Sequence, residues 1–277
     1  MKKETADLNF ARKIELAEIV PWFDMWDSIP DSFAKQYRME KYRFDSARML
    51  LSPIIQFSHF NQVMGLGLNK PASEEEVDQL LSIYHSAQVR NIELHVIPHT
   101  QPDQLTSWLS KRGLRKVSCW DRIYRGNEPL TYTNYKLPNM AVEKVSEKTA
   151  DEWATFLVNS YNLQVTKPMA LGFAIRPRWH HYLLKEKGKI KAIRSQYVHD
   201  NGTAWWGVEA PVPGFMTQRF NLDHHLCGEM INDGLKLGVN LFIGEIESVS
   251  LAMDHDGYKN FEALGFKYLY TRSNYSF

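Results

Sequence analysis

Apolar and polar positions follow a clear order in the last third of the chain. β-branched and aromatic side chains fill residues 203–212, as is typical of a strand, and Pro211 and Pro213 end it. A second apolar run at residues 239–246 predicts another strand. Between them, after a polar turn, apolar residues recur near the helical period and precede Gly238; they are Leu222, Leu226, Met230, Ile231, Leu235 and Leu237. The pattern predicts a strand–loop–helix–strand crossover whose helix begins with outward-facing backbone N–H groups, a place suited to phosphate.

The first half of the chain also alternates helices with strands. Residues 1–50 are predicted to be mainly helical. A helix is well defined after Pro71, because Ser73 suits its N-cap and Glu76 lies three residues on, as in a capping box. The predicted elements that follow residue 50 are strands at 51–57 and 60–68, a helix at 73–86, a strand at 92–97, a helix at 102–112 and a strand at 115–124.

The second half repeats this order. Both halves end with a short helix, a glycine (Gly113 or Gly265) and a strand. We therefore predict two copies of one α/β unit, residues 1–128 and 139–277, joined by a segment rich in proline and asparagine. A hairpin is expected at Asp200-Asn-Gly202. The other predicted elements of this half are helices at 146–162, 174–187 and 256–264 and strands at 189–199, 203–212 and 266–272.

The composition is that of a folded protein. Hydrophobic residues make up 44% of the 277, and the net charge is +1, from 33 basic and 32 acidic residues. A charge this close to zero predicts neither a nucleic acid nor an anionic membrane as a partner. Cys119 and Cys227 alone indicate neither a disulfide framework nor a cysteine-built zinc site. Because no apolar run has the length of a membrane span and the N-terminus lacks a signal-peptide pattern, we expect a cytoplasmic protein.

Two segments of the sequence resemble motifs of the GNAT N-acetyltransferase superfamily. They are Asn61-Gln-Val-Met-Gly-Leu-Gly67 and Tyr258-Lys-Asn-Phe-Glu-Ala-Leu-Gly-Phe266, set among the elements predicted above. The resemblance is to a tandem GNAT protein and covers roughly residues 45–277. It implies an α/β (α+β) fold of two tandem GNAT-like domains, the first with a helical N-terminal extension. Each domain would be a mixed, mostly antiparallel and splayed sheet flanked by helices. Acetyl-CoA, or another acyl-CoA, would bind beside the fourth strand.

The resemblance places the pyrophosphate-binding loop at residues 218–223, where the family has Gln/Arg-x-x-Gly-x-Gly/Ala. Gln218 fits, whereas Asn221 and Asp223 replace small residues. Asn tolerates the positive φ of such a turn. Asp223 either caps the helix or repels the phosphates, a repulsion that Arg219 would offset. The residues implied to contact the cofactor are Val212, Gln218, Arg219, Phe220, Asn221, Leu222, Asp223 and Asn260.

The corresponding loop of the first half has a different charge. Glu74, Glu75 and Glu76 stand where phosphates would lie, and they suit the first turn of an ordinary helix. Residues 1–128 are therefore predicted not to bind the cofactor and to serve as a support or a lid.

Acyl transfer to an amine requires donors to the thioester carbonyl, a base for the ammonium proton and an acid for the thiolate. Backbone N–H groups of residues 206–212 are the candidate donors. Glu209 is the candidate base; otherwise it is an exposed strand carboxylate. Glu245 and Glu247 share one face of the next strand, so either is a candidate to reach the cleft where acyl transfer would occur. Glu247 is a candidate to bind the substrate.

The family's tyrosine acid is replaced here. It would lie four residues before the glycine of the last helix, where this chain has Phe261. Tyr258, about one turn earlier, is either a substitute acid or a packing residue. Asn260 either hydrogen-bonds a pantetheine amide or caps local backbone.

A basic and aromatic cluster stands where the resemblance implies the acceptor site. It either binds an acidic or aromatic acceptor or forms a solvated helix start; its members are Arg176, Arg178, Trp179 and Tyr182. The pairs His180-His181 and His224-His225 lack the i, i+4 spacing of metal ligands, and no metal is predicted.

The leading hypothesis is an acyl-CoA-dependent N-acetyltransferase that acts on a small primary amine by direct transfer. The alternative is a non-catalytic, GNAT-like ligand-binding or interaction protein, which Asn221, Asp223 and Phe261 prompt. A third possibility retains the fold for a different reaction, such as decarboxylation of an acyl-CoA.

Overall fold

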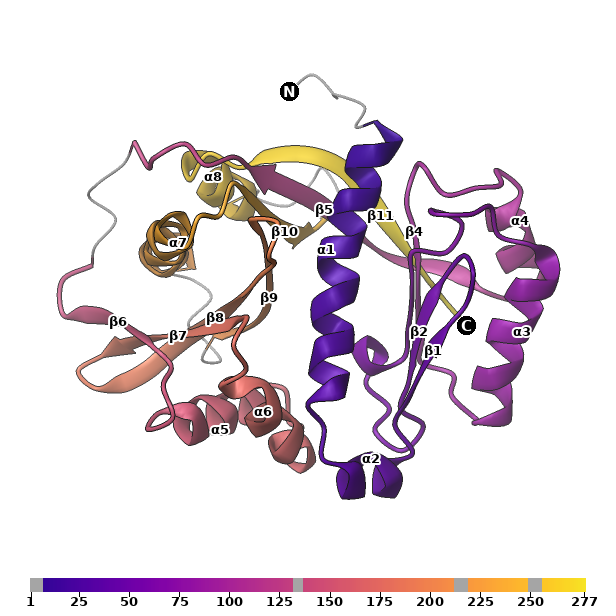
Figure 1. The fold of residues 1–277 in the computed structure, drawn as a ribbon, viewed down its shortest axis with the longest axis horizontal. Helices are drawn as coiled ribbons and strands as arrows, with labels where there is room; N and C mark the ends of the chain where they lie inside the picture. Colours follow the sequence, from indigo (N-terminus) through magenta and orange to yellow (C-terminus); the bar gives the residue numbers. More distant parts are fainter. Residues whose placement is uncertain (1–6, 132–136, 212–218, 249–255) are drawn as a thin grey trace.

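The computed structural model describes residues 7–131, 137–211, 219–248 and 256–277, with the backbone alone at 211, 219–223 and 256–257. Within these residues, eleven strands form one sheet in the order β1-β2-β3-β4-β11-β5-β10-β9-β8-β7-β6 (Figure 1). The strands are β1 (Glu40–Arg43), β2 (Arg48–Leu51), β3 (Gln62–Met64), β4 (Glu93–Val96), β5 (Arg115–Arg125), β6 (Met140–Lys144), β7 (Trp179–Glu186), β8 (Lys189–Val198), β9 (Thr203–Pro211), β10 (Leu241–Glu247) and β11 (Lys267–Ser276). The helices are α1 (Leu8–Asp27), α2 (Asp31–Tyr37), α3 (Glu74–Ser86), α4 (Leu105–Lys111), α5 (Ala150–Ser160), α6 (Lys167–Ala174), α7 (Arg219–Lys236) and α8 (Asp256–Ala263), with 3-10 turns η1 (Ser58–Phe60) and η2 (Gln164–Thr166).

The predicted fold class is confirmed. Among the described strands, only β3–β4 and β9–β10 pair in parallel, and the other neighbours are antiparallel. The β9–α7–β10 segment is the predicted crossover. Ser73 caps α3 as predicted, because its hydroxyl accepts the backbone N–H of Glu76 at 3.1 Å.

One predicted helix is wrong. In residues 174–187 the helix α6 ends at Ala174, and β7 runs from Trp179 to Glu186. The side chains of β7 are buried on both faces of the sheet, with Leu183 in one hydrophobic cluster and Leu184 in another. A strand buried on both faces lacks the alternation of apolar and polar residues that marks a half-buried strand, so periodicity does not identify Trp179–Glu186 as a strand. The segment Glu40–Arg43, in the region predicted to be mainly helical, also forms a strand.

The two halves of the chain contribute interleaved strands at the centre of the sheet. The last strand, β11, pairs with β4 and β5 of the first half. In turn β5 lies between β11 and β10 of the second half. The sheet is therefore continuous across both halves, and α1 lies upright over its middle (Figure 1).

Three hydrophobic clusters fix the helices on the sheet. On the strands of the second half, α5 and α6 share one cluster with α1 of the first half, and α7 and α8 share another on the opposite face. Successive residues of β9 alternate between them, Trp205 belonging to the first and Trp206 to the second. The strands of the first half pack on α3 and α4 through the third cluster.

A buried group of charged side chains joins α1 to the strands. It comprises Glu15 and Glu18 of α1, Arg122 of β5, Glu245 of β10 and Arg272 of β11. Arg122 donates to Glu15 Oε1 at 3.1 Å and to Glu245 Oε2 at 2.8 Å, and it also binds Glu18. Arg272 donates to Glu18 Oε2 at 2.6 Å and to Glu245 Oε2 at 2.8 Å. Because a buried charge is costly without a partner, this charged cluster fixes the position of α1.

The same region contains the one group of described side chains close enough together to hold a metal ion, Glu15, Glu18 and His95. Both of its carboxylates already accept hydrogen bonds from guanidinium groups. We therefore assign Glu15 and Glu18 to charge pairing.

We expect Arg122→Ala to lower the free energy of unfolding by about 3–5 kcal/mol, because it leaves buried carboxylates without their partner. Urea unfolding followed by circular dichroism measures this loss. The matched control is Arg112→Ala, since Arg112 pairs with Asp78 and Glu74 near the surface, where ion pairs contribute far less. Similar losses in the two variants would contradict the role given to the charged cluster.

His181 is buried among aromatic rings where α5 and α6 pack on β7. Its ring centroid lies 4.0 Å from that of Trp153 and 5.4 Å from that of Phe173. Burial lowers the pKa of His181 to about 3; a hydrogen bond to the Phe173 carbonyl opposes this effect, and His180 adds to it. The folded protein therefore keeps this imidazole neutral under mildly acidic conditions.

We expect the free energy of unfolding to fall as the pH falls from 6.5 to 5. The unfolded chain takes up a proton at His181 near pH 6.5, whereas the folded chain does so only near pH 3. His181 therefore lowers the free energy of unfolding by up to about 1.4 kcal/mol for each pH unit below 6.5. His180, with a pKa of about 4, acts in the same direction. In denaturation series across this pH range, His181→Gln should flatten the slope and the exposed control His85→Gln should not. An unchanged slope in His181→Gln would rule out this explanation.

Candidate functional site

β9 and β10 pair over three residues and then separate. Their parallel register runs from Thr203 opposite Leu241 to Trp205 opposite Ile243. Beyond it, β10 stays paired with β5 and β9 stays paired with β8. The sheet is therefore open between the two strands that α7 connects.

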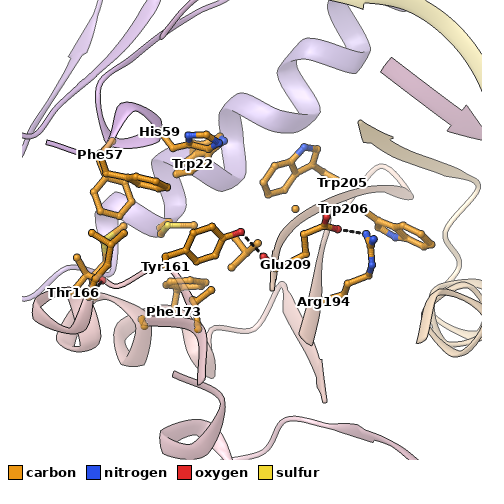
Figure 2. A pocket seen from close by; sticks show the side chains of 18 of the residues that line it. Trp22, Phe57, His59, Tyr161, Thr166, Phe173, Arg194, Trp205, Trp206 and Glu209 are labelled. Atoms are coloured by element: carbon orange, nitrogen blue, oxygen red, sulfur yellow. Dashed lines mark hydrogen bonds and ion pairs between the residues drawn. The ribbon is translucent and has the colours of Figure 1, made fainter. Parts of the chain in front are cut away.

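A β-bulge interrupts β9 beside this gap. Val208 and Glu209 together lie opposite Arg194, and Val208 has a φ of 56°, which β-branched residues rarely adopt. The Tyr161 hydroxyl donates to the Glu209 carbonyl, and Arg194 binds the Glu209 carboxylate (Figure 2). Backbone strain that neighbouring side chains maintain in this way is common at ligand-binding sites.

A cavity of about 200 Å³ lies where the two strands separate (Figure 2). Gly207 of β9 and Gly244 of β10 line it at the gap. It is also lined by Trp205 from the α1 face of the sheet and by Trp206 and Phe261 from the α7–α8 face. The cavity therefore crosses the sheet.

Residues of the first half form one wall of the cavity. Trp22 and Met25 come from α1, and Phe57, His59 and Phe60 come from η1 and the residue before it. Figure 2 shows Trp22 and His59 across the cavity from Tyr161 and Phe173. That second wall is also mainly apolar and comprises Leu157, Val158, Tyr161, Leu163, Thr166, Met169, Ala170 and Phe173 of α5, η2, α6 and the residues between them.

Two carboxylates lie on the strands beside the gap. Glu209 forms the ion pair with Arg194. Glu245 belongs to the charged cluster and also lines the cavity. Burial raises the pKa of Glu245, but the guanidinium groups of Arg272 and Arg122 outweigh burial and lower the pKa below its ordinary value. Glu245 is therefore ionised near neutral pH and places negative charge at the cavity.

The two predicted catalytic residues have different positions. Glu209 lines the cavity. Tyr258 is not among the lining residues that the structure describes; its hydroxyl donates to Asp121 of β5. Burial and this hydrogen bond raise the pKa of Tyr258, so its hydroxyl is a weak proton donor there. Phe261, at the position of the family's tyrosine, does line the cavity.

Most of the side chains predicted to bind the cofactor lie outside the part of the chain whose side chains the structure describes. Val212 and Gln218 lie outside the described residues, and of residues 219–223 only the backbone is described, as the first turn of α7. Asn260 is 1% exposed, and its side-chain nitrogen and oxygen have no hydrogen-bond partner within the described residues. Buried amides are nearly always paired, and Asn260 is not among the described residues that line the cavity.

The residues predicted to bind the acceptor do not line the cavity. Arg176 donates to both carboxylate oxygens of Asp24 on α1, at 2.9 and 2.6 Å, and Trp179 donates to the same carboxylate at 2.9 Å. Arg178 binds Asp200 in the hairpin turn. The reason is that β7 forms where a helix was predicted, while the second wall comes from α5, η2 and α6.

Tyr182 and Glu247 also lie away from the cavity. Tyr182 is buried on the α7 side of β7, where its hydroxyl donates to Asp233 Oδ2 at 3.2 Å and accepts from Gln196 Nε2 at 2.9 Å. Glu247 is exposed near the end of β10. Of the two carboxylates considered on that strand, the structure places Glu245 at the cavity.

Sequence patterns do not predict the wall from the first half. Trp22 and His59 are remote in sequence from Trp205, and only the packing of α1 and η1 brings them together. The available signal was Phe57-Ser-His-Phe60, a histidine among aromatic residues between two predicted strands. Such residues in a connecting segment are frequently functional.

Comparison with solved structures identifies the fold. A GCN5-related N-acetyltransferase from Kribbella flavida is similar, with a TM-score of 0.60, 12% identity and coverage of 88% of this chain and 93% of that chain. A tandem GNAT protein from the clavulanic acid biosynthesis pathway has a TM-score of 0.58 and 10% identity, and the match covers 83% of this chain and 78% of that chain. A functionally unknown conserved protein from Staphylococcus epidermidis has a TM-score of 0.59 and 10% identity, and the match covers 87% of this chain and 96% of that chain. The chain therefore has the tandem GNAT fold that its sequence predicts.

The sequence comparisons add no closer relative. No model of a protein family matches the chain, and neither does any curated protein. Among the described residues, no helix is both long and apolar enough to span a bilayer.

We expect Gly207→Ala to lower the free energy of unfolding by about 1–3 kcal/mol, because a Cβ at this position collides with the Trp205 ring on the same face of β9. Gly244→Ala is the matched control at the same gap, since its Cβ meets Ile123 at an ordinary 3.6 Å. Chemical denaturation of both variants measures the difference. Equal stability of the two would show that Trp205 is not fixed at the cavity.

Proposed function

We propose that this protein is an acyl-CoA-dependent N-acyltransferase, with acetyl-CoA as the expected donor, and that its acceptor is a small primary amine on an apolar body. The observation that carries the proposal is the cavity that crosses the sheet where β9 and β10 separate. Two reactants that approach from opposite faces of the sheet would meet there. Direct transfer requires this juxtaposition of amine and thioester.

The α7–α8 face suits the acyl-CoA. The first backbone N–H groups of α7 have no partner within the helix, and helix N-termini of this kind favour phosphate. Asn260 on α8, whose buried amide has no partner within the described residues, would pair with an amide of the pantetheine arm. When bound, the acyl-CoA supplies an activated acyl group as a thioester.

The backbone of β9 suits the acyl carbonyl. Beyond Trp205, β9 has no pairing with β10 within the described residues, and the bulge at Val208 alters the direction of its backbone groups. Backbone N–H groups at such a gap can donate to a carbonyl oxygen as negative charge develops on it.

The α1 and α5–α6 face suits the amine. Its walls bring the rings of Trp22, Phe57 and Phe173 around a small volume, which favours an apolar or aromatic body over a polar one. The ionised Glu245 attracts an ammonium group toward the gap. This combination favours a primary amine over an acidic acceptor.

We expect acetyl-CoA to bind in calorimetry and CoA thiol release to depend on the added amine. Because the acceptor walls are apolar, 2-phenylethylamine should be a better acceptor than ethanolamine or glutamate. The isosteric control 2-phenylethanol, which lacks the nitrogen, should not be acylated. Mass spectrometry of the product checks the assignment.

Two results would count against the proposal in different ways. Absence of binding at millimolar acetyl-CoA would reject the acyl-CoA assignment. Binding of acetyl-CoA without transfer to any amine would favour the non-catalytic, ligand-binding alternative.

A further inference from the structure

A histidine from the first half faces the cavity with a carboxylate behind it. His59 of η1 lines the cavity (Figure 2), and its Nδ1 lies 3.1 Å from Glu93 Oε1. The Ser58 hydroxyl lies 3.2 Å from the same nitrogen and donates to the same Glu93 oxygen at 2.6 Å. The imidazole is also held from one side, because it stacks on Phe57 with 4.9 Å between centroids and an interplanar angle of 17°.

Glu93 is fixed and ionised. Burial raises its pKa, but hydrogen bonds and charge interactions with His59 and His95 outweigh burial and hold the pKa far below the ordinary range. An ionised carboxylate is only an acceptor, so the His59 nitrogen that faces it carries the proton. The neutral imidazole therefore has Nδ1–H toward Glu93 and a lone pair on Nε2, the arrangement of a base oriented by a carboxylate.

The other titratable groups around His59 are less suited to accept a proton. Glu245 of β10 interacts electrostatically with His59 but binds two arginines of the charged cluster. On β9, Glu209 is paired with Arg194 of β8. Tyr161, directly after α5, donates its hydroxyl hydrogen bond to the Glu209 carbonyl, and His95 Nε2 of β4 lies 3.8 Å from Glu93 Oε2.

We propose that His59 is the base that deprotonates the acceptor's ammonium group and that Glu93 is its positioning residue. This inference rests on the proposed function. His59 Nε2 takes one ammonium proton, and the freed amine nitrogen forms a bond to the acyl carbon. The thioester C–S bond breaks, the departing thiolate takes the second proton of the attacking nitrogen, and His59 passes its proton to solvent. One proton is released for each amide and thiol formed.

The proposal gives the first half a chemical role. In it, β9 and β10 of the second half form the gap, while η1 and β4 of the first half supply the base and its carboxylate. Residues 1–128 would then contribute more than the support or lid that their sequence predicts.

The test compares three variants in the amine-transfer assay across pH 5.5–9. His59→Gln should lower kcat/KM about 100-fold and remove the acidic limb of its pH profile, because the base is lost. Glu93→Gln should give a smaller loss, because the imidazole remains but the carboxylate that orients it is gone. His85→Gln, an exposed histidine on α3, is the matched control and should behave as the wild type. Calorimetry should show unchanged acetyl-CoA affinity in all three, which also establishes that they are folded.

Imidazole ¹H–¹⁵N correlation spectra provide a readout that does not depend on activity. In the wild type, neutral His59 should be the Nδ1–H tautomer, and Glu93→Gln should weaken this preference. The Nε2–H tautomer, or a His59→Gln variant with wild-type kcat/KM and an intact acidic limb, would overturn the proposal. Wild-type protein without any transfer activity would instead reject the proposed function, and the tautomer would still decide whether Glu93 orients His59.

Discussion

The pairing of buried charges between α1 and the sheet is the interaction on which the remaining architecture depends. Arg122 and Arg272, at most 2% exposed, pair with two glutamates of α1 and with Glu245 of β10. The same helix, two turns on, presents Trp22 to the cavity, and Glu245 belongs both to the charged cluster and to the cavity lining. Charges that are paired for stability therefore also set the distance between the aromatic wall and the gap in the sheet.

The cavity arises from two departures from regular sheet structure. β9 leaves β10 after three pairs, and the bulge at Val208 then separates its backbone from the regular register with β8. Each departure is compensated nearby, since β10 pairs with β5 of the other half, and Arg194 and Tyr161 hold the bulge. A gap that costs ladder hydrogen bonds is thus stabilised by strands and side chains around it.

Local signals predict the β9–α7–β10 crossover well, but they miss β7 and do not predict the composition of the site. Pro211 and Gly238 mark the ends of β9 and α7, because proline and glycine restrict the backbone wherever they occur. Arg176 resembles an anion-binding residue in sequence, yet Asp24, far away in the chain, neutralises it. His59 becomes a candidate only when β4 brings Glu93 beside it. Contacts between distant segments decided these outcomes, and no short pattern encodes them.

The position of β11 has a consequence for biosynthesis. The strand Lys267–Ser276 lies between β4 and β5, although it is the last of the described strands to be synthesised. The central sheet of the first half therefore stays incomplete until these residues emerge from the ribosome. Such non-local pairing slows folding and leaves strand edges exposed meanwhile. Nascent chains of this protein would depend on chaperones for longer than those whose domains close one after the other.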